Sequence, residues 1–379
     1  MRIGFLLSSF YPNTGGREVI TFSLAKELVK RGHKVHVFTS LTEDLKPEEI
    51  IEGIHIHRTK TFFQYKYYLE FNPGWIKNVL KYKLDILHIQ SFGFIMADVA
   101  VLLEKYLHST KIVNTPHGPF MALTDYPAWQ KALKKIYGAI EFPINRNYDA
   151  VIQVNPEQWK WMTKAGVKKN NIFLIPNSIP KEMFMEVSNK SFIKKYHLEN
   201  KLVISYLGRI QEYKGLDQVI KVLPDLIKAN KNIVFLAIGK DAGDMDRLKE
   251  LAEELKVSRN VIFTGLLSHE DKLKALDASE IAVLPSDWEA FGIGILESMS
   301  RGNAIISTKT EGGKFLIKEG VNGYLYDYKD LTTLKAQLLT LIKNDSLRKK
   351  IINNNKKLSK NFSTENITTK LENVYRIIK

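Results

Sequence analysis

The sequence contains no cysteine among its 379 residues, and several other familiar signatures are missing as well. Without cysteine, disulfides and thiolate metal sites are excluded, which is compatible with a reducing cytoplasm. No stretch approaches the ~20 apolar residues of a membrane span. The apolar run Ile3–Leu7 is too short for a secretory signal and is typical of a first strand. We therefore expect a cytoplasmic protein.

The motifs of several functional classes are also absent. There is no GxxxxGK[ST] phosphate loop, no GxSxG elbow and no complete GxGxxG fingerprint, which disfavours kinases, serine hydrolases and typical dehydrogenases. There is no zinc finger or RNP-like segment. The net charge of +15 is spread over both halves of the chain and selects no partner. We predict no nucleic-acid partner.

Two groups of residues have a superficial likeness to metal ligands. Asp244 and Asp246 alternate, but they immediately precede a helical pattern, where aspartate is common as a cap or in the first turn. The histidines at 33, 36, 55 and 57 alternate along predicted strands rather than converging as a helical HExxH pair would. The sequence therefore predicts no metal site and no cofactor.

What is present indicates a soluble α/β protein of two domains. Hydrophobic content is 44% and charged content 26%, and the chain is long enough for two cores. Apolar runs alternate with helical patterns in both halves, which predicts parallel, doubly wound sheets. The predicted strands are 3–7, 34–39, 54–57, 86–90, 111–115 and 150–154, then 202–207, 233–238, 261–264, 281–285 and 304–307. The predicted helices are 20–31, 216–230, 245–256, 270–279 and 367–378.

The boundary between the halves is predicted at Pro176–Pro180. Two prolines within five residues rule out a regular helix or a central strand there. We therefore assign residues 1–180 to a first Rossmann-like domain and residues 181–361 to a second.

The segment Glu289–Glu297 carries two carboxylates around a glycine-rich turn. It follows a predicted buried strand and opens a helix, a position where sheet edges and helix N-termini bind anionic ligands. Gly292 and Gly294 would let a phosphorylated ligand approach the backbone. The alternative is an acidic first turn that stabilises the helix dipole.

Other candidate residues also follow predicted strands. Gly15 and Gly16 lie between the first strand and its helix, where glycines serve either phosphate binding or tight turns. Arg209 ends a strand of the second half and Lys214 opens the next helix, so both cations suit a diphosphate unless they are merely solvated. His117 follows the strand 111–115, and a lone histidine is more often structural.

Taken together, these segments resemble the retaining GT-B glycosyltransferases of the family-four, or glycosyl transferases group 1, type. The resemblance spans almost the whole chain and rests on Gly15-Gly16, Asp149–Ile152, Ile175–Asn177, Gly208-Arg209, Lys214-Gly215, Gly265, Pro285-Ser286, Glu289–Glu297, Glu311–Gly313 and Gly320–Gly323. It implies two Rossmann-like domains that face each other across a cleft. It also implies that the helix at 362–379 packs back on the first domain.

The resemblance assigns a role to each matching residue. Arg209 and Lys214 would stabilise the leaving diphosphate, Glu297 would bind the ribose hydroxyls, and Glu289 would contact the transferred sugar. The backbone at Phe291, Gly292 and Ile293 would surround that sugar, Gly15 and Gly16 would lie against the diphosphate, and His117 would lie near the sugar. Front-face attack without an enzymic nucleophile is usual in this family, so Glu289 is not assigned as one. The chain departs from relatives at Ser178–Pro180, where many have Gly-Val-Asp, and at Leu316, where many have glutamate.

The implied reaction moves a sugar from a UDP-, GDP- or ADP-sugar to a glycan or lipid-linked acceptor, without a metal. Two alternatives remain open at this point: a nucleotide-sugar epimerase of similar architecture, and a non-catalytic partner subunit that retains only the fold.

Two further segments are candidates for contact with an anionic membrane surface. They are Tyr65–Tyr68 and Trp129–Arg146, in which Lys131, Lys134, Lys135 and Arg146 accompany Leu133, Ile136, Tyr137 and Ile140. The alternative is an ordinary surface helix whose lysines extend towards water.

Overall fold

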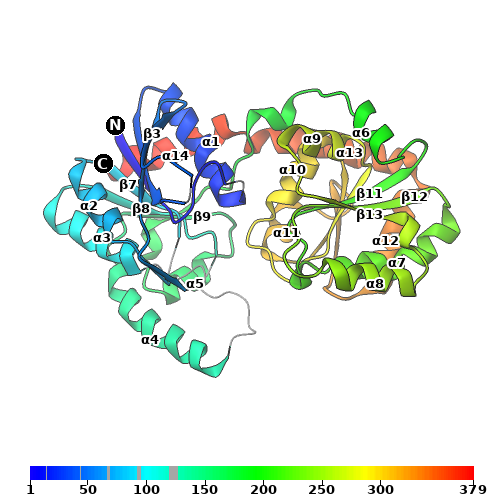
Figure 1. Ribbon diagram of the computed structural model, residues 1–379, viewed down its shortest axis with the longest axis horizontal. Helices are drawn as coiled ribbons and strands as arrows, with labels where there is room; N and C mark the ends of the chain where they lie inside the picture. Colours follow the sequence, from blue (N-terminus) through cyan, green and yellow to red (C-terminus); the bar gives the residue numbers. More distant parts are fainter. Residues whose placement is uncertain (14, 43, 66–68, 92–94, 119–126) are drawn as a thin grey trace. The chain divides into compact units, whose positions relative to one another are not determined.

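The computed structural model describes residues 1–379 except 14, 43, 66–68, 92–94 and 119–126. The described chain divides into two compact units (Figure 1). The first unit comprises Met1–Ser178 together with Thr364–Lys379, and the second comprises Ile179–Ser363. Among the helices described, none is long and apolar enough to cross a membrane.

The first unit contains an eight-stranded sheet in the order β10-β9-β8-β7-β1-β2-β4-β3. All neighbours are parallel except β3 and β4, which are antiparallel. The strands are β1 Arg2–Leu6, β2 Lys34–Ser40, β3 Glu48–Ile51, β4 Ile54–Thr59, β7 Ile86–Ile89, β8 Lys111–Asn114, β9 Ala150–Gln153 and β10 Ile172–Leu174, with a separate hairpin of β5 Phe63–Tyr65 and β6 Leu69–Phe71. The strand order reverses between β1 and β7, the position at which open α/β sheets form a ligand crevice beyond the carboxyl ends of the strands.

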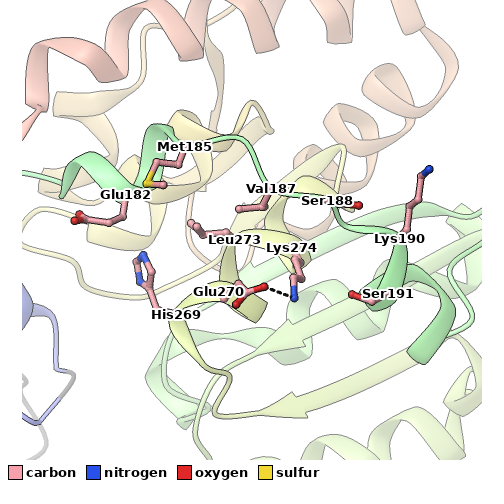
Figure 2. Close-up of a pocket in the computed structure, with 10 residues that line it drawn as sticks. All are labelled: Glu182, Met185, Val187, Ser188, Lys190, Ser191, His269, Glu270, Leu273 and Lys274. Carbon is pink, nitrogen blue, oxygen red and sulfur yellow. Dashed lines mark ion pairs between the residues drawn. The ribbon is translucent and has the colours of Figure 1, made fainter.

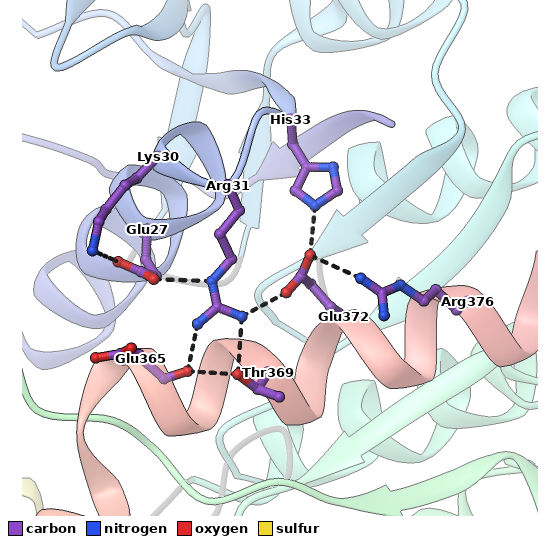
Figure 3. Close-up of polar contacts among 8 residues, drawn as sticks. All are labelled: Glu27, Lys30, Arg31, His33, Glu365, Thr369, Glu372 and Arg376. Atoms are coloured by element: carbon purple, nitrogen blue, oxygen red, sulfur yellow. Dashed lines mark hydrogen bonds and ion pairs between the residues drawn. The ribbon is translucent and has the colours of Figure 1, made fainter.

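The helices of the first unit are α1 Gly16–Lys30, α2 Pro73–Lys81, α3 Ile95–Leu107, α4 Ala128–Asn145, α5 Trp159–Lys164 and α14 Thr364–Ile378, with a short 3-10 turn η1 at Lys169–Asn171. The helix α14 packs on α1 and buries Ile367, Leu371, Val374 and Tyr375. Figure 3 shows the polar side of this contact: Glu372 accepts hydrogen bonds from Arg31 at 2.6 Å and from His33 at 2.7 Å. The segment after the second unit is thereby tied to the beginning of the chain.

The second unit contains a six-stranded parallel sheet in the order β13-β12-β11-β14-β15-β16. The strands are β11 Leu202–Leu207, β12 Ile233–Ile238, β13 Val261–Gly265, β14 Ile281–Leu284, β15 Ala304–Thr308 and β16 Gly323–Tyr326. The helices are α6 Lys190–Lys195, α7 Leu216–Ala229, α8 Met245–Glu254, α9 His269–Asp277, α10 Ile293–Arg301, α11 Glu311–Leu316, α12 Leu331–Lys343 and α13 Asp345–Ser359. The 3-10 turns are η2 Lys181–Phe184, η3 Glu212–Lys214, η4 Ser258–Asn260 and η5 Lys360–Phe362. Figure 1 shows α9, α10 and α13 on one side of this sheet and α7, α8 and α12 on the other.

The predicted fold class is confirmed, since both units are α/β with mainly parallel sheets. Buried strands made the prediction possible: β12 and β14 are buried at every residue, as expected for strands covered on both faces. Every predicted strand is present, with ends within one or two residues. The strands β3, β5, β6, β10 and β16 were not predicted, because they are only three or four residues long; β3, β10 and β16 also lie at sheet edges.

Candidate functional site

The strand order in the sheet of the second unit reverses between β11 and β14, and the candidate residues follow these two parallel strands. Arg209 comes two residues after β11, and Glu289 lies in the loop between β14 and α10. In open α/β sheets the carboxyl ends of strands at such a reversal form the ligand crevice. The fold of this unit therefore brings the predicted cation and carboxylate to one sheet edge.

Lys214 and Glu289 form an ion pair at this edge. The Lys214 ammonium donates a hydrogen bond to Glu289 Oε1, and the Ser286 hydroxyl donates to the same oxygen at 3.2 Å. Burial alone would lower the pKa of Lys214, but the charge of Glu289 and its hydrogen bond outweigh burial and raise that pKa. Lys214 is therefore a fixed cation at neutral pH, held by a carboxylate 75 residues further along the chain.

The turn that presents Lys214 depends on Gly215. This residue has φ +68° and is the N-cap of α7. A Cβ added here would lie 2.3 Å from the Pro285 carbonyl oxygen, so only glycine fits between η3 and the end of β14. The close approach places Lys214 beside the loop that carries Glu289.

Arg209 is exposed at the same edge. Its backbone carbonyl accepts a hydrogen bond from Tyr206 at 2.9 Å, and its guanidinium is 3.4 Å from the Tyr213 hydroxyl. The Tyr213 ring also lies under the Lys214 ammonium, 4.6 Å from ring centroid to Nζ. Tyr213 thus contacts both cations, and it was not identified from the sequence.

The segment from Glu289 to Glu297 turns into α10 as predicted for a strand-to-helix junction. Gly292 is the N-cap of α10 with φ +81°, and the first N–H groups of the helix lack partners within it. Phe291 is buried and its ring lies near those of Phe315 and Phe362, with centroids 6.1 and 6.3 Å away. The Phe291 side chain is therefore enclosed by other aromatic rings of the second unit.

Glu297 lies one turn inside α10 and accepts a hydrogen bond from Lys272 of α9 at 2.6 Å. Both side chains are largely buried. Lys272 was not identified from the sequence. It lies in a predicted amphipathic helix, and no motif links it to a glutamate 25 positions later. The two carboxylates of the segment are therefore each paired with a lysine, at separate points of the second unit.

The remaining predicted residues lie in the first unit. Gly15 is the N-cap of α1 and Gly16 is its first residue, and both are exposed. A Cβ on Gly15 would lie 2.2 Å from Glu18 Oε2. Arg17 donates hydrogen bonds to Ser8 and Glu18, both at 3.1 Å. The glycines therefore begin α1, and the Arg17 side chain in its first turn is already hydrogen-bonded within the protein.

His117 follows β8 in a left-handed backbone conformation with φ +58°. Its Nε2 is 2.8 Å from Gln90 Oε1, at the end of the neighbouring β7. Burial, and then the nearby Arg17, lower the pKa of His117 to about 3, so the ring is neutral at physiological pH. Because Gln90 Oε1 accepts, the proton is on Nε2. Gln90 was not identified from the sequence.

The structure corrects two predictions about the residues that resemble metal ligands: that the histidines do not converge, and that Asp244 caps a helix. His36 and His57 do converge: they are 2.9 Å apart between ring nitrogens, and His55 stacks on His36, because β2 and β4 lie side by side. Asp244 occupies the N-cap position of α8 but makes no capping bond, and it pairs with Arg247 instead. Within the described part of the chain, no group of three or more His, Asp or Glu could hold a metal ion.

A hollow of about 670 Å³ lies elsewhere in the second unit. It is formed by the segment 182–191 and the first half of α9, and an ion pair of Lys274 with Glu270 at 2.7 Å lies in its wall. Figure 2 shows the side chains around it. None of the predicted site residues lines this hollow. Of the predicted site residues, His117 lines a much smaller cavity of about 20 Å³ in the first unit, together with Gln90.

Comparisons with known proteins place this geometry in context. The family model for glycosyl transferases group 1 matches residues 188–358, and that for glycosyltransferase family 4 matches residues 14–182. N-acetyl-alpha-D-glucosaminyl L-malate synthase of Bacillus anthracis is 24% identical over 374 residues, covering 96% of this chain and 94% of the relative.

Solved structures share the fold over the full chain. Sucrose-phosphate synthase from Thermosynechococcus elongatus has a TM-score of 0.85 at 18% identity and covers 100% of this chain and 98% of its own. HepE of Anabaena, solved with UDP and glucose, has a TM-score of 0.80 at 18% identity and covers both chains completely. These similarities extend over both units.

Proposed function

We propose, from the premise that this chain belongs to the GT-B glycosyltransferases of the group 1 type, that it is a retaining enzyme that uses a nucleotide-diphosphate sugar. One observation carries the proposal. Lys214 and Glu289 form a partly buried ion pair near Arg209, where the strand order of the second sheet reverses. The family models describe glycosyltransferases, which disfavours the epimerase alternative.

Lys214 and Arg209 have the properties needed at the leaving group. When the bond from sugar to phosphate breaks, negative charge grows on the diphosphate, and preorganised cations stabilise it. An ammonium has three N–H donors, so Lys214 can keep its bond to Glu289 and still donate to a phosphate oxygen. The exposed guanidinium of Arg209 supplies a planar fork for the same group.

Glu289 has two proposed tasks. It fixes Lys214, and it accepts hydrogen bonds from the hydroxyls of the transferred sugar. The backbone at Phe291, Gly292 and Ile293 adds polar groups at the N-terminus of α10, where the helix dipole favours an anion. We propose no covalent intermediate on Glu289, since its carboxylate is already engaged by a lysine and a serine.

Glu297 is proposed to bind the ribose. A carboxylate has about four acceptor positions, so the bond from Lys272 leaves room for two vicinal hydroxyls. Lys272 is proposed as a positioning residue that holds the carboxylate in one orientation.

In the first unit, Gly15 and Gly16 are proposed to meet the diphosphate through backbone N–H groups, and His117 to meet the transferred sugar. A neutral His117 with its Nε2 proton on Gln90 leaves Nδ1 as an acceptor for a sugar hydroxyl. It would act as a hydrogen-bonding group and not as a cation.

The proposed donor is a UDP-, GDP- or ADP-sugar, and the proposed acceptor is a glycan or a lipid-linked molecule. We propose that the reaction needs no metal, because the two cations of the second unit neutralise the diphosphate. The enzyme would work in the cytoplasm, and with a lipid-linked acceptor it would act peripherally at a membrane surface.

Thermal unfolding of the purified chain in the presence of UDP, GDP, ADP and CMP tests the donor site. A ligand that binds only the folded state adds RT ln(1 + [L]/Kd), about 2.7 kcal/mol at one hundred times Kd. One nucleotide should raise Tm, and Arg209→Ala and Glu297→Ala should reduce that rise. The controls Arg259→Ala and Glu250→Ala remove an exposed charge of the same sign in the same unit and should leave the rise unchanged.

No rise of Tm with any nucleotide at millimolar concentration would contradict the proposal and favour a non-catalytic partner subunit. Once a donor is found, proton NMR of the product gives the anomeric configuration. Retention is expected, and inversion would refute that part. Activity that vanishes with EDTA and returns with Mg²⁺ or Mn²⁺ would refute metal independence.

A further inference from the structure

The helix α4 buries polar residues and exposes large apolar ones, which is the opposite of an ordinary surface helix. Its buried residues are the polar Gln130, Glu141 and Asn145. Its large exposed residues are apolar: Trp129 is 56% exposed, Leu133 45%, Ile136 62% and Ile140 57%. A surface helix of a soluble protein normally has the opposite arrangement, so the apolar face requires an explanation.

The inner face is held by polar bonds that fix the rotation of α4. The Tyr137 hydroxyl donates to Asp98 of α3, and Asn145 donates to the carbonyl of Ala165 at 2.8 Å. Burial, and then Glu141, raise the pKa of Asp98 to about 8. Rolling the helix to bury its apolar side chains would break these bonds in a buried place, which is costly.

The exposed apolar residues form one stripe. Trp129, Leu133, Ile136 and Ile140 are spaced by four, three and four residues, which places them along one line of a helix. We call these four residues the apolar stripe. Tyr137, which the sequence pattern had grouped with them, belongs to the inner face instead. Figure 1 shows α4 on the outside of its unit.

Exposed cations lie on another side of α4, more than about 100° around the helix axis from the apolar stripe at 3.6 residues per turn. Lys131, Lys135 and Arg146 are exposed. Lys134 is only half-buried and is not counted with them. The sole acidic residue between Ala128 and Asn145 is Glu141, which is buried. The exposed surface of the helix therefore offers apolar side chains and positive charge, and no carboxylate of α4 itself.

We propose that α4 is a docking surface for an anionic phospholipid bilayer. The helix would lie in the plane of the interface, with the apolar stripe at the boundary of the acyl chains and Lys131, Lys135 and Arg146 among the phosphates. Trp129 has the amphipathic ring that is favoured at such a boundary. The net charge of +15 adds a general attraction to the same surface.

A bilayer fits this surface better than a second copy of the chain. Two copies paired through α4 would bring the same exposed cations towards each other, without carboxylates of α4 to compensate. An anionic lipid surface satisfies the apolar stripe and the cations at once. None of the residues proposed for the donor belongs to α4, so the docking surface and the proposed reaction can fail independently.

Vesicle flotation tests the docking surface. The full chain is mixed with vesicles of phosphatidylcholine alone, or with 30% phosphatidylglycerol (on the order of a typical anionic content), and the floated fraction is measured. The wild type should float with the anionic vesicles, and Ile136→Ser with Ile140→Ser should lower the partition coefficient at least about tenfold. Lys131→Gln with Lys135→Gln should remove the preference for anionic lipid.

Ile50→Ser is the matched control, since Ile50 is 65% exposed on β3 of the same unit. It should float as the wild type does. Unchanged thermal unfolding of each variant excludes misfolding. The proposal is overturned if the wild type does not float with anionic vesicles, or if the Ile136/Ile140 variant floats equally well. A dimer in analytical ultracentrifugation that only this variant loses would also overturn it, since the occupant would then be a second copy.

The membrane candidate at Tyr65–Tyr68 does not enter this argument, because residues 66–68 lie outside the described residues.

Discussion

Replacement of Glu372 by glutamine should weaken the attachment of α14 to the first unit. The Glu372 carboxylate accepts from Arg31 at 2.6 Å and from His33 at 2.7 Å, and Arg376 lies 3.6 Å away (Figure 3). A hydrogen bond with a charged group contributes about 1.5–3 kcal/mol and a neutral one about 1 kcal/mol. Arg31 is partly exposed and keeps its bond to Glu27, so we expect a net loss of about 1–2 kcal/mol at pH 7.

The pH dependence of this stability loss shows whether the ionised Glu372 carboxylate is its cause. Burial alone would raise the pKa of Glu372, but the hydrogen bonds from His33 and Arg31 outweigh it and hold that pKa below its ordinary value. A carboxylate with a lowered pKa stabilises the folded state above the pKa of the unfolded chain, about 4.5 for this glutamate. The contribution is lost as the pH falls through the folded-state pKa. The difference between Glu372→Gln and wild type should therefore shrink as the pH falls below about 4.5.

Urea unfolding followed by tryptophan fluorescence measures this difference, since Trp75, Trp129, Trp159 and Trp161 all lie in the first unit. Glu365→Gln is the control: it removes the same charge from the same helix but keeps the backbone carbonyl that Arg31 binds at 2.8 Å. The reasoning is refuted if the two variants unfold alike at pH 7, or if the loss for Glu372→Gln is the same at pH 4 and pH 7.

Four further outcomes are expected. Lys214→Met should lower kcat at least about 100-fold, because it removes a cation from the leaving group, and a steady-state assay that shows only a changed KM would contradict this. Lys272→Gln should raise KM for the donor about tenfold with kcat nearly unchanged, the pattern of lost positioning, and a loss confined to kcat would exclude that role. Gly215→Ala should destabilise the second unit by about 1–3 kcal/mol because of its positive φ and the Pro285 carbonyl; unaltered urea unfolding of this variant would show that the turn relaxes freely. The ring of His117 should stay neutral down to pH 5 in NMR titration, since its pKa is lowered to about 3. In the unfolded chain the same ring takes up a proton below about pH 6.5. This histidine should therefore make folding less favourable as the pH falls.

The sequence predicted those parts of the fold that depend on short-range patterns. Fully buried strands such as β12 are continuously apolar, and Gly292 marks the left-handed turn into α10. The strand β3, with the sequence Glu-Glu-Ile-Ile, gave no such signal because half of it faces solvent at the sheet edge. An edge strand of this kind lacks the continuous apolar run that marks a fully buried strand.

Contacts between distant segments were not predictable in the same way. Lys214 and Glu289 were each identified from their positions after strands, but their ion pair depends on how β11 and β14 lie side by side. Lys272 was missed because its partner is on another helix. The inner face of α4 was misassigned at Tyr137, since its partner Asp98 lies on α3 and both faces of α4 contain large apolar or aromatic side chains.

The position of α14 has a consequence for the order in which the protein matures. The ribosome makes Met1–Ser178 first, but the first unit also needs Thr364–Lys379, which emerges only after the whole of Ile179–Ser363. At about 5–20 residues per second, that interval lasts on the order of 10 to 40 seconds. During it the surface of α1 that α14 will cover, including Ile20 and Leu24, has no native cover. The second unit, made later, is continuous and can fold before the first is complete, so the earliest part of the chain to be synthesised is the last to be finished.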